Sequence, residues 1–369
     1  MNRIPLVDLS VQHREIADEV RAGFDALYDS GAFVLGEEVA AFEREFAAFC
    51  GTGQAVGVAN GTDALELALR AAGVGAGQEV ILPANTFIAT AEAVVRAGGR
   101  PVLVDSDPRY DLIDPTRVKD AVGPRTRAII PVHLYGQVAP VQELAQLADA
   151  AGLVMIEDAA QSQGARRDGR AAGSFGLAAA TSFYPGKNLG AYGDGGAVLT
   201  GDGELARRLR ALRNHGSEIR YQHPELGFNS RLDSLQAVVL RAKLRRLHTW
   251  NAARRAAADR YAGLLADLEQ VTLPATLPGN EHVWHLYVVR VPERDRVLGE
   301  LQAAGIGAGI HYPVPVHLQG AFAHLGHERG DFPVAEAAAE RILSLPLYPG
   351  ITPEQQERVA AELRRAVAR

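Results

Sequence analysis

Lys187 stands out among the residues that could do chemistry. The chain has 38 lysines and arginines, and only Lys119, Lys187 and Lys243 are lysines, so arginine supplies nearly all of the positive charge. An amine can lose its proton and attack a carbonyl, which a guanidinium cannot do. Lys187 lies in the glycine-rich stretch TSFYPGKNLGAYGDGGAV, residues 181–198, where small neighbours let the backbone approach a ligand. The position suits either a Schiff-base lysine or an ordinary solvated surface lysine.

Asp158 is the second candidate. It follows Glu157 at the end of the apolar run LVMI, residues 153–156, and a carboxylate at the end of a parallel strand points toward the ligand crevice. A loop acid that caps the next helix is the competing interpretation. Asp158 and Lys187 together supply what pyridoxal phosphate needs, an amine for its aldehyde and an acid that keeps its ring nitrogen protonated. The pair therefore predicts a pyridoxal phosphate site.

Other residues would complete such a site. The stretch NGTD, residues 60–63, opens a predicted helix, and the N–H groups of a helix N-terminus can bind a phosphate. Gly61 would let the backbone approach, and the hydroxyls of Thr62 and Ser182 would donate to the phosphate. Phe87 could cover one face of a ring. Each of these residues also has an ordinary structural explanation, as part of a helix cap or as a core aromatic.

Other ligand classes fit less well. The stretch GVGAGQ, residues 73–78, resembles a dinucleotide fingerprint, but it follows a helix and precedes a strand, which is the reverse of the required order. The histidines show no metal-ligand spacing, so we expect no metal site. Three polar rings lie close together in a proline-rich loop, namely His311, Tyr312 and His317. Together they suggest one wall of a substrate-binding cavity, although a lone histidine in such a loop is more often structural.

The elements that must position these residues alternate along the chain. Apolar runs at 79–84, 101–106, 128–134, 153–160 and 195–201 predict strands, and the patterns at 60–72, 89–98 and 141–152 predict helices. Near-continuous apolar strands separated by helices predict an α/β fold whose central sheet is mostly parallel and covered on both faces. Ligands of such sheets bind beyond the carboxyl ends of the strands.

The C-terminal third has a different pattern. An arginine-rich helical pattern over 232–265 predicts one long connecting helix. A strand at 282–292, a helix at 294–304 and a terminal helix at 353–368 follow it. We therefore predict a large domain over residues 1–245 and a smaller α+β domain over residues 246–369.

Composition excludes several classes of protein. The 369 residues carry a net charge of −6, with 47% hydrophobic and 22% charged residues, which is typical of a globular protein. The slight acidity disfavours nucleic acid or an anionic membrane as the main partner. The sequence shows neither a signal peptide nor a membrane-spanning run, which predicts a cytoplasmic protein. A single cysteine, Cys50, excludes an internal disulfide.

Taken together, the motifs resemble a known family. The segments NGTDALELALRA (60–71), VILPANTFIATAEAV (80–94), IEDAAQSQGA (156–165), SFYPGKNLGAYGDGGA (182–197) and HYPVPVHLQ (311–319) are similar to those of the DegT/DnrJ/StrS sugar aminotransferases. These are pyridoxal phosphate enzymes of fold type I. The resemblance covers nearly the whole chain and implies a large domain with a mostly parallel central sheet and a smaller C-terminal domain.

The resemblance also implies roles for individual residues. Lys187 would hold the cofactor as a Schiff base and move a proton during amino transfer, and Asp158 would pair with the pyridine nitrogen. The other cofactor contacts would be Gly61, Thr62, Phe87, Gln161, Ser182 and Asn229. The sugar-nucleotide contacts would be Tyr184, Arg220, His311 and Tyr312. Asn229 and Arg220 would reach across the interface of a homodimer.

By the same resemblance, we expect transamination of a nucleotide-linked keto sugar. The sequence is most similar to the 3-aminotransferases that convert dTDP-3-oxo-6-deoxyhexoses to dTDP-3-amino-3,6-dideoxyhexoses for antibiotics or surface glycans, with L-glutamate as the amino donor. Related dehydratases carry histidine in place of the Schiff-base lysine, so Lys187 favours transamination. The alternatives are a 4-aminotransferase acting on a 4-oxo sugar nucleotide, a keto-cyclitol aminotransferase and a non-catalytic ligand sensor.

Overall fold

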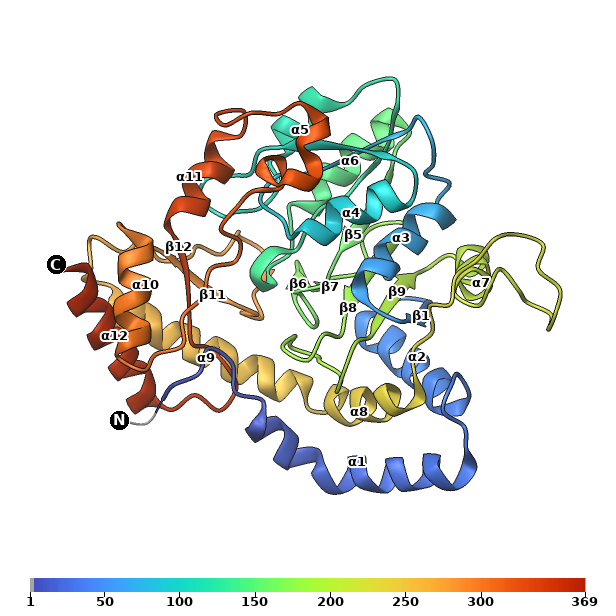
Figure 1. Ribbon diagram of the computed structural model, residues 1–369, viewed down its shortest axis with the longest axis horizontal. Coiled ribbons are helices and arrows are strands. Elements are labelled where there is room, and N and C mark those ends of the chain that lie inside the picture. Colours follow the sequence, from blue (N-terminus) through green and yellow to red (C-terminus); the bar gives the residue numbers. More distant parts are fainter. Residues whose placement is uncertain (1–2, 369) are drawn as a thin grey trace.

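The centre of the protein is a seven-stranded sheet. The structure, a computed structural model, describes residues 3–368 (Figure 1). The strands lie in the order β1 (Gln54–Val58), β9 (Gly196–Thr200), β8 (Ala178–Ser182), β5 (Val154–Asp158), β4 (Thr126–Ile129), β2 (Glu79–Pro83) and β3 (Arg100–Val104). Only β9 runs antiparallel to its neighbours, and every other adjacent pair is parallel. The predicted α/β fold with a mostly parallel central sheet is confirmed.

Alternate residues of the strands enter separate cores on the two faces of the sheet. In β5, Ile156 packs in one core and Met155 in another, and Val198 and Leu199 of β9 divide in the same way. One face is covered by α3 (Gly61–Ala71), α4 (Ile88–Arg96) and α7 (Gly203–Leu212). The other is covered by α2 (Glu37–Cys50), α5 (Pro115–Ala121), α6 (Val141–Ala151) and α8 (Ser234–Leu244). A strand buried on both faces needs apolar residues at every position, which explains the continuous apolar runs.

The prediction of one long connecting helix over 232–265 is wrong in one respect. The structure has two helices there, α8 and α9 (Leu247–Leu265), which are separated at Arg245 and Arg246. Helix α8 packs against α1 (Ser10–Ser30) and α2, whereas α9 packs against α12 (Pro353–Val367). The break lets one stretch of chain serve two cores, one against the central sheet and one beside α12 (Figure 1).

A second core forms around the C-terminal elements. Strand β11 (Tyr287–Arg290) pairs antiparallel with β12 (Ile342–Leu345), and α9, α10 (Arg294–Ala303) and α12 cover the pair. The strand predicted at 282–292 is therefore shorter than expected, while both predicted helices form. Ile4 also packs in this core and bridges to Ile306, so the two ends of the chain lie beside it (Figure 1). The domain boundary at 245 stays a prediction.

Some elements were not predicted. Strand β1 is short and contains Gly57, and α1 exposes much of its surface, so both give weak apolar patterns. Further elements are α11 (Pro333–Arg341) and a small sheet of β10 (Asn280–Glu281), β6 (Arg166–Arg167) and β7 (Arg170–Ala171). Within residues 3–368, no helix combines the length and the apolar character needed to cross a bilayer.

Candidate active site

The carboxyl ends of the central strands face one cavity. Asp158 ends β5, Ser182 ends β8, and Asn60 follows β1. They meet at one edge because these strands run in the same direction. The cavity has a volume of about 550 Å³, and ten of the predicted site residues line it: Gly61, Thr62, Phe87, Asp158, Gln161, Ser182, Tyr184, Lys187, His311 and Tyr312.

Lys187 is partly buried in the wall of this cavity. Its loop leaves the end of β8 in a tight turn, in which the Lys187 N–H donates to the Tyr184 carbonyl at 2.8 Å. Burial lowers the pKa of the amine to about 8, and the Asp158 carboxylate opposes that shift. About a tenth of such an amine is neutral at pH 7. The neutral form is the one that attacks an aldehyde.

Asp158 is only 6% exposed. Its Oδ2 accepts a hydrogen bond from Thr90 Oγ1 at 2.7 Å, and its Oδ1 accepts one from the Ala160 N–H at 3.2 Å. Burial raises the pKa of the carboxyl, and these two hydrogen bonds oppose the rise. A buried carboxylate is stabilised by a cation beside it. The protonated ring nitrogen of pyridoxal phosphate is a cation of this kind.

Glu157, next to Asp158 in β5, turns to the opposite face of the sheet. It is fully buried and accepts a hydrogen bond from His133 Nε2 at 2.8 Å. It also accepts hydrogen bonds from the backbone N–H groups of Gly173, Phe175 and Gly176. Glu157 therefore holds a loop in place, and Asp158 is the carboxylate of this pair that reaches the cavity.

The first turn of α3 forms a candidate phosphate site. Asn60 caps the helix by accepting a hydrogen bond from the Asp63 N–H at 2.8 Å, and the first-turn N–H groups of a helix have no carbonyl partners within it. A Cβ on Gly61 would lie 2.6 Å from the Cβ of Ser182, so glycine is required for this close approach. The approach brings the Ser182 hydroxyl next to the positive end of the helix dipole, where an anion binds favourably.

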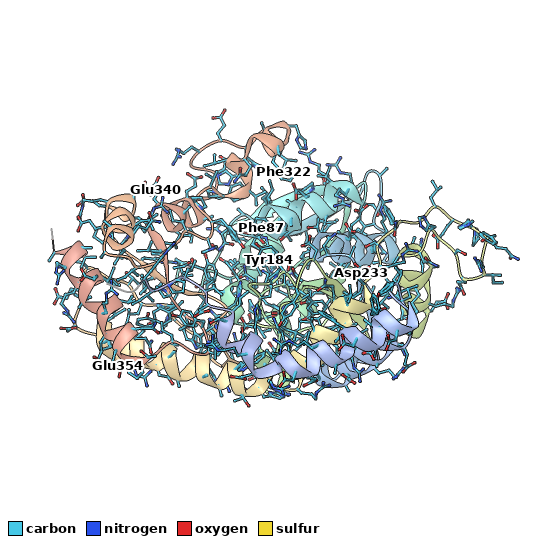
Figure 2. The ribbon with its side chains drawn as sticks, turned by 60° about the horizontal axis from the view of Figure 1, so that its bottom comes forward. Phe87, Tyr184, Asp233, Phe322, Glu340 and Glu354 are labelled. Carbon is cyan, nitrogen blue, oxygen red and sulfur yellow. The ribbon has the colours of Figure 1, made fainter. Side chains whose placement is uncertain are left out.

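Gln161 and three aromatic residues shape the middle of the cavity. Gln161 Oε1 accepts from the Tyr135 N–H at 2.6 Å, and its Nε2 donates to the Tyr312 hydroxyl at 3.0 Å. The Phe87 ring lies 5.1 Å from the Tyr312 ring. Phe87 and Tyr184 are 49% and 60% exposed and lie near each other in Figure 2. Both rings therefore have open surface for a ligand.

His311 also reaches the cavity. Its Nδ1 shares a hydrogen bond with Ser344 Oγ at 2.8 Å, and burial lowers its pKa to about 4, so the ring is neutral at pH 7. His317, the third ring of the suggested substrate wall, is buried elsewhere and pairs with Glu336 at 2.9 Å. Of the three rings, His311 and Tyr312 therefore line the cavity and His317 does not, so a contact of the first two with substrate stays a prediction.

Two predicted contacts lie outside the cavity. Arg220 and Asn229 are exposed on the segment that follows α7, and this segment extends away from the sheet (Figure 1). The Arg220 guanidinium lies over the Tyr221 ring, 4.9 Å from its centroid. Both residues were predicted to act in the site of a neighbouring subunit, so that role stays a prediction.

The cavity residues that sequence reasoning missed include Thr90, Asp194 and His285. Thr90 lies on the first turns of α4, three residues after Phe87, and this spacing places both on one helix face. That spacing was the available signal for Thr90. His285 lies in the segment that was predicted as a regular strand, so nothing in the local pattern marked it.

The other two lysines lie away from the cavity. Lys119 is exposed on α5. Lys243, on α8, is buried and donates to the Gly190 carbonyl at 2.6 Å, with its amine 5.0 Å from the centre of the Tyr192 ring. Gly190 and Tyr192 belong to the glycine-rich loop, so Lys243 supports the loop that carries Lys187.

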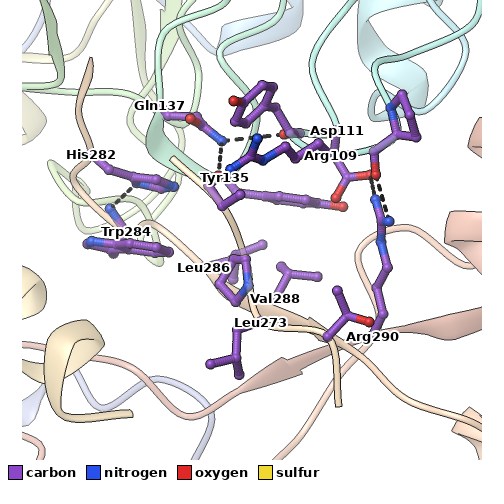
Figure 3. Close-up of a pocket in the computed structure, with 15 residues that line it drawn as sticks. Arg109, Asp111, Tyr135, Gln137, Leu273, His282, Trp284, Leu286, Val288 and Arg290 are labelled. Carbon is purple, nitrogen blue, oxygen red and sulfur yellow. Dashed lines mark hydrogen bonds and ion pairs between the residues drawn. The ribbon is translucent and has the colours of Figure 1, made fainter. Parts of the chain in front are cut away.

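Figure 3 shows a second cavity, of about 230 Å³. It shares Leu286 with the first. Its charged wall contains Arg290, which forms an ion pair with Asp111 at 2.6 Å. The predicted site residues do not line it. Among residues 3–368, no group of three or more histidine, cysteine or acidic side chains is placed to hold a metal ion.

The comparisons with known proteins decide the family. Residues 14–364 match the DegT/DnrJ/EryC1/StrS aminotransferase family. The chain belongs to this family. It is therefore an aminotransferase, and its cofactor is pyridoxal phosphate. Both statements agree with the sequence-based predictions.

Individual relatives are similar over the full length. The dTDP-3-amino-3,4,6-trideoxy-alpha-D-glucose transaminase of Streptomyces venezuelae is 49% identical, over 98% of this chain and 96% of the relative. The UDP-N-acetyl-3-dehydro-alpha-D-glucosamine 3-aminotransferase of Acidithiobacillus ferrooxidans is 48% identical, over 99% and 98%. The crystal structure of S. venezuelae DesV in complex with a ketimine intermediate superimposes with a TM-score of 0.98 at 48% identity and covers 100% of both chains.

The residues of the cavity fit this cofactor. A buried carboxylate, a lysine of lowered pKa and a helix N-terminus line one space. They match the ring nitrogen, the aldehyde and the phosphate of pyridoxal phosphate respectively. When bound, the cofactor supplies an aldehyde that exchanges for an amino group and a ring that withdraws electrons. The aminotransferase itself supplies orientation and a group that moves protons.

Proposed function

We propose that this aminotransferase adds an amino group to carbon 3 of a dTDP-linked 3-oxo-6-deoxyhexose and so forms a dTDP-3-amino-3,6-dideoxyhexose. L-Glutamate is the proposed amino donor. The main support is that Lys187 and Asp158 line a cavity with exposed aromatic rings. The names of both curated relatives place the amino group at carbon 3, which supports the regiochemistry. Such a product would serve antibiotic or surface-glycan biosynthesis.

Each of the ten predicted residues that line the cavity has a task in this proposal. Lys187 would hold the cofactor aldehyde and would later move a proton at the substrate carbon. Asp158 would keep the ring nitrogen protonated, and Gln161 would donate to the ring hydroxyl oxygen. Gly61, Thr62 and Ser182 would bind the phosphate, and Phe87 would cover the ring. Tyr184, His311 and Tyr312 contact the sugar nucleotide.

The active unit in this proposal is a homodimer. The segment after α7 carries Ile219, Tyr221 and Leu226, which are 61%, 79% and 95% exposed in a single chain. Apolar side chains gathered on an extended segment are stabilised when a second copy covers them. Packing of this segment on a partner would bring Asn229 to the partner's cofactor phosphate and Arg220 to the diphosphate of its substrate.

The proposal is tested with purified enzyme, glutamate and a panel of sugar nucleotides. The panel contains dTDP-3-oxo-6-deoxyglucose, its galacto epimer, the 4-oxo analogues and a UDP-linked 3-oxo sugar. Mass spectrometry detects amination, and NMR locates the new amine. We expect amination of the dTDP-linked 3-oxo sugars at carbon 3. An amine at carbon 4, or a preference for the UDP sugar, contradicts the substrate assignment, and tight binding without amino exchange contradicts transamination.

A further inference from the structure

His285 is a cavity residue to which the proposed function gives no task. It lies between β10 and β11 and lines the cavity together with Lys187. The backbone just before it is held by Arg254, a fully buried residue that donates to the carbonyls of Trp284 at 3.2 Å and Leu347 at 3.0 Å. The ring therefore occupies a position that the surrounding structure fixes.

A chain of hydrogen bonds determines which ring nitrogen of His285 carries the proton. Asn251 Nδ2 donates to the Gln163 carbonyl at 2.9 Å, so its Oδ1 is free to accept from Asn188 Nδ2, also at 2.9 Å. Asn188 Nδ2 donates as well to the Val283 carbonyl at 2.9 Å. Since backbone carbonyls only accept, the orientation of both amides follows.

The chain ends at the histidine ring. Asn188 Oδ1 lies 3.3 Å from His285 Nδ1, and because this oxygen can only accept, Nδ1 must carry the hydrogen. Burial lowers the pKa of His285 well below its ordinary value, and the nearby positive charges add to the effect. The neutral ring then has an unprotonated Nε2. No described residue donates to this nitrogen in the structure, so Nε2 is the free acceptor of a ring that lines the cavity.

We propose that His285 is a specificity-determining residue whose Nε2 accepts a hydrogen bond from a sugar hydroxyl on a carbon next to the one that receives the amine. This inference rests on the proposed function. A carbonyl, ether or phosphate oxygen has no hydrogen to donate, whereas a hydroxyl has one. A substrate lacking that hydroxyl would leave Nε2 desolvated and unpaired, which weakens its binding.

The two half-reactions test this proposal separately. We expect His285→Phe to retain the visible absorption of bound cofactor and to react with glutamate within about twofold of the wild-type rate. Its kcat/KM for the 3-oxo sugar should fall about tenfold or more. The matched control is His324→Phe, which changes an exposed histidine of the 3-10 helix η3 (Gly320–Leu325) and should behave as wild type. A larger loss with glutamate, or no loss with the sugar, overturns the proposal.

Deoxygenated substrates give a readout that a structural role would not change. Wild-type enzyme should prefer the 3-oxo sugar over its 2-deoxy or its 4-deoxy analogue, and His285→Phe should lose one of these preferences. His285→Gln, whose side-chain oxygen reaches near the position of Nε2, should restore part of it. Unchanged preferences in His285→Phe overturn the hydroxyl assignment.

The protonation state is measurable without any sugar. In wild-type holoenzyme, the nitrogen-15 NMR shifts of the His285 ring, assigned by their absence in His285→Gln, should show a protonated Nδ1 and an unprotonated Nε2. A protonated Nε2 overturns the inference. If wild type aminates no sugar, the proposed function fails together with the hydroxyl assignment, and the NMR shifts still decide whether Nε2 is an acceptor.

Discussion

At the scale of single residues, the reactivity of Lys187 comes from its surroundings. Lys187→Ala removes the amine that binds the cofactor aldehyde, so we expect both turnover and the visible absorption of the bound cofactor to disappear. Lys119→Ala removes an exposed lysine of α5 and is the matched control, with both properties retained. Absorption spectra and a glutamate-dependent assay check this. Wild-type turnover in Lys187→Ala is incompatible with the assigned role.

The lowered pKa of Lys187 predicts how cofactor uptake depends on pH. Burial brings this pKa from 10.5 to about 8 in the cofactor-free protein, and only the neutral amine attacks the aldehyde. The amine is protonated below that pKa, so the rate of reconstitution with pyridoxal phosphate should rise through about pH 8 and then level off. Stopped-flow absorbance measures the rate. A rise that continues to pH 10 would show that the amine is not perturbed.

Asp158 is expected to act through its charge. Asp158→Asn keeps the size of the side chain and an oxygen that can accept from Thr90, but it cannot stabilise a protonated ring nitrogen. We expect turnover to fall roughly 100-fold or more, as for the loss of other preorganised electrostatic contacts, while the protein still binds cofactor. Thr90→Val removes the hydrogen bonds of Thr90 to Asp158 and Thr86 but leaves the charge of Asp158, so it should have a smaller effect. Equal losses in the two variants would argue against a role for the charge.

At the scale of elements, the start of α3 and the end of β8 must come close together. Gly61→Val places a side chain where a Cβ alone would be 2.6 Å from Ser182, so it should push the helix N-terminus away from the phosphate. We expect cofactor affinity to fall about tenfold or more, since charge-assisted hydrogen bonds are lost, and the protein to be destabilised by about 1–3 kcal/mol.

Gly75→Ala is the control for this prediction, because a Cβ there meets open space. Equilibrium dialysis measures cofactor affinity, and thermal unfolding of the cofactor-free proteins measures stability. Unchanged affinity in Gly61→Val would remove α3 from the phosphate site.

At the scale of the whole molecule, the proposed homodimer predicts complementation between two inactive variants. Lys187→Ala damages a chain's own cavity, whereas Asn229→Ala would damage the cavity of its partner. A mixed dimer then has one cavity with both defects and one with neither. After unfolding and refolding an equal mixture, half of the dimers are mixed, so activity should recover to about a quarter of wild type. Recovery should be absent if Asn229 serves the cavity of its own chain.

Much of this protein was predictable because local sequence carries the relevant physics. Continuous apolar runs, such as those that form β2, β5 and β9, indicate a sheet that is buried on both faces. Asp158 and Lys187 were identifiable because a strand-end carboxylate and an isolated lysine among glycines are rare combinations with specific chemistry. The break between α8 and α9 was not predictable, because the helix-forming pattern continues through Arg245 and Arg246, and the break depends on which core each half contacts.

Sequence alone determined the fold class and predicted the residue types that line the candidate cofactor site, because apolar periodicity and motif spacing are local properties. Only the tertiary structure decided that Asp158 enters the cavity while Glu157 holds a loop, since that depends on which face of the sheet each side chain meets. The tertiary structure also decided which ring nitrogen of His285 carries the proton. The direction of each hydrogen bond depends on contacts between Asn188, Asn251 and two backbone carbonyls, which come from distant parts of the chain.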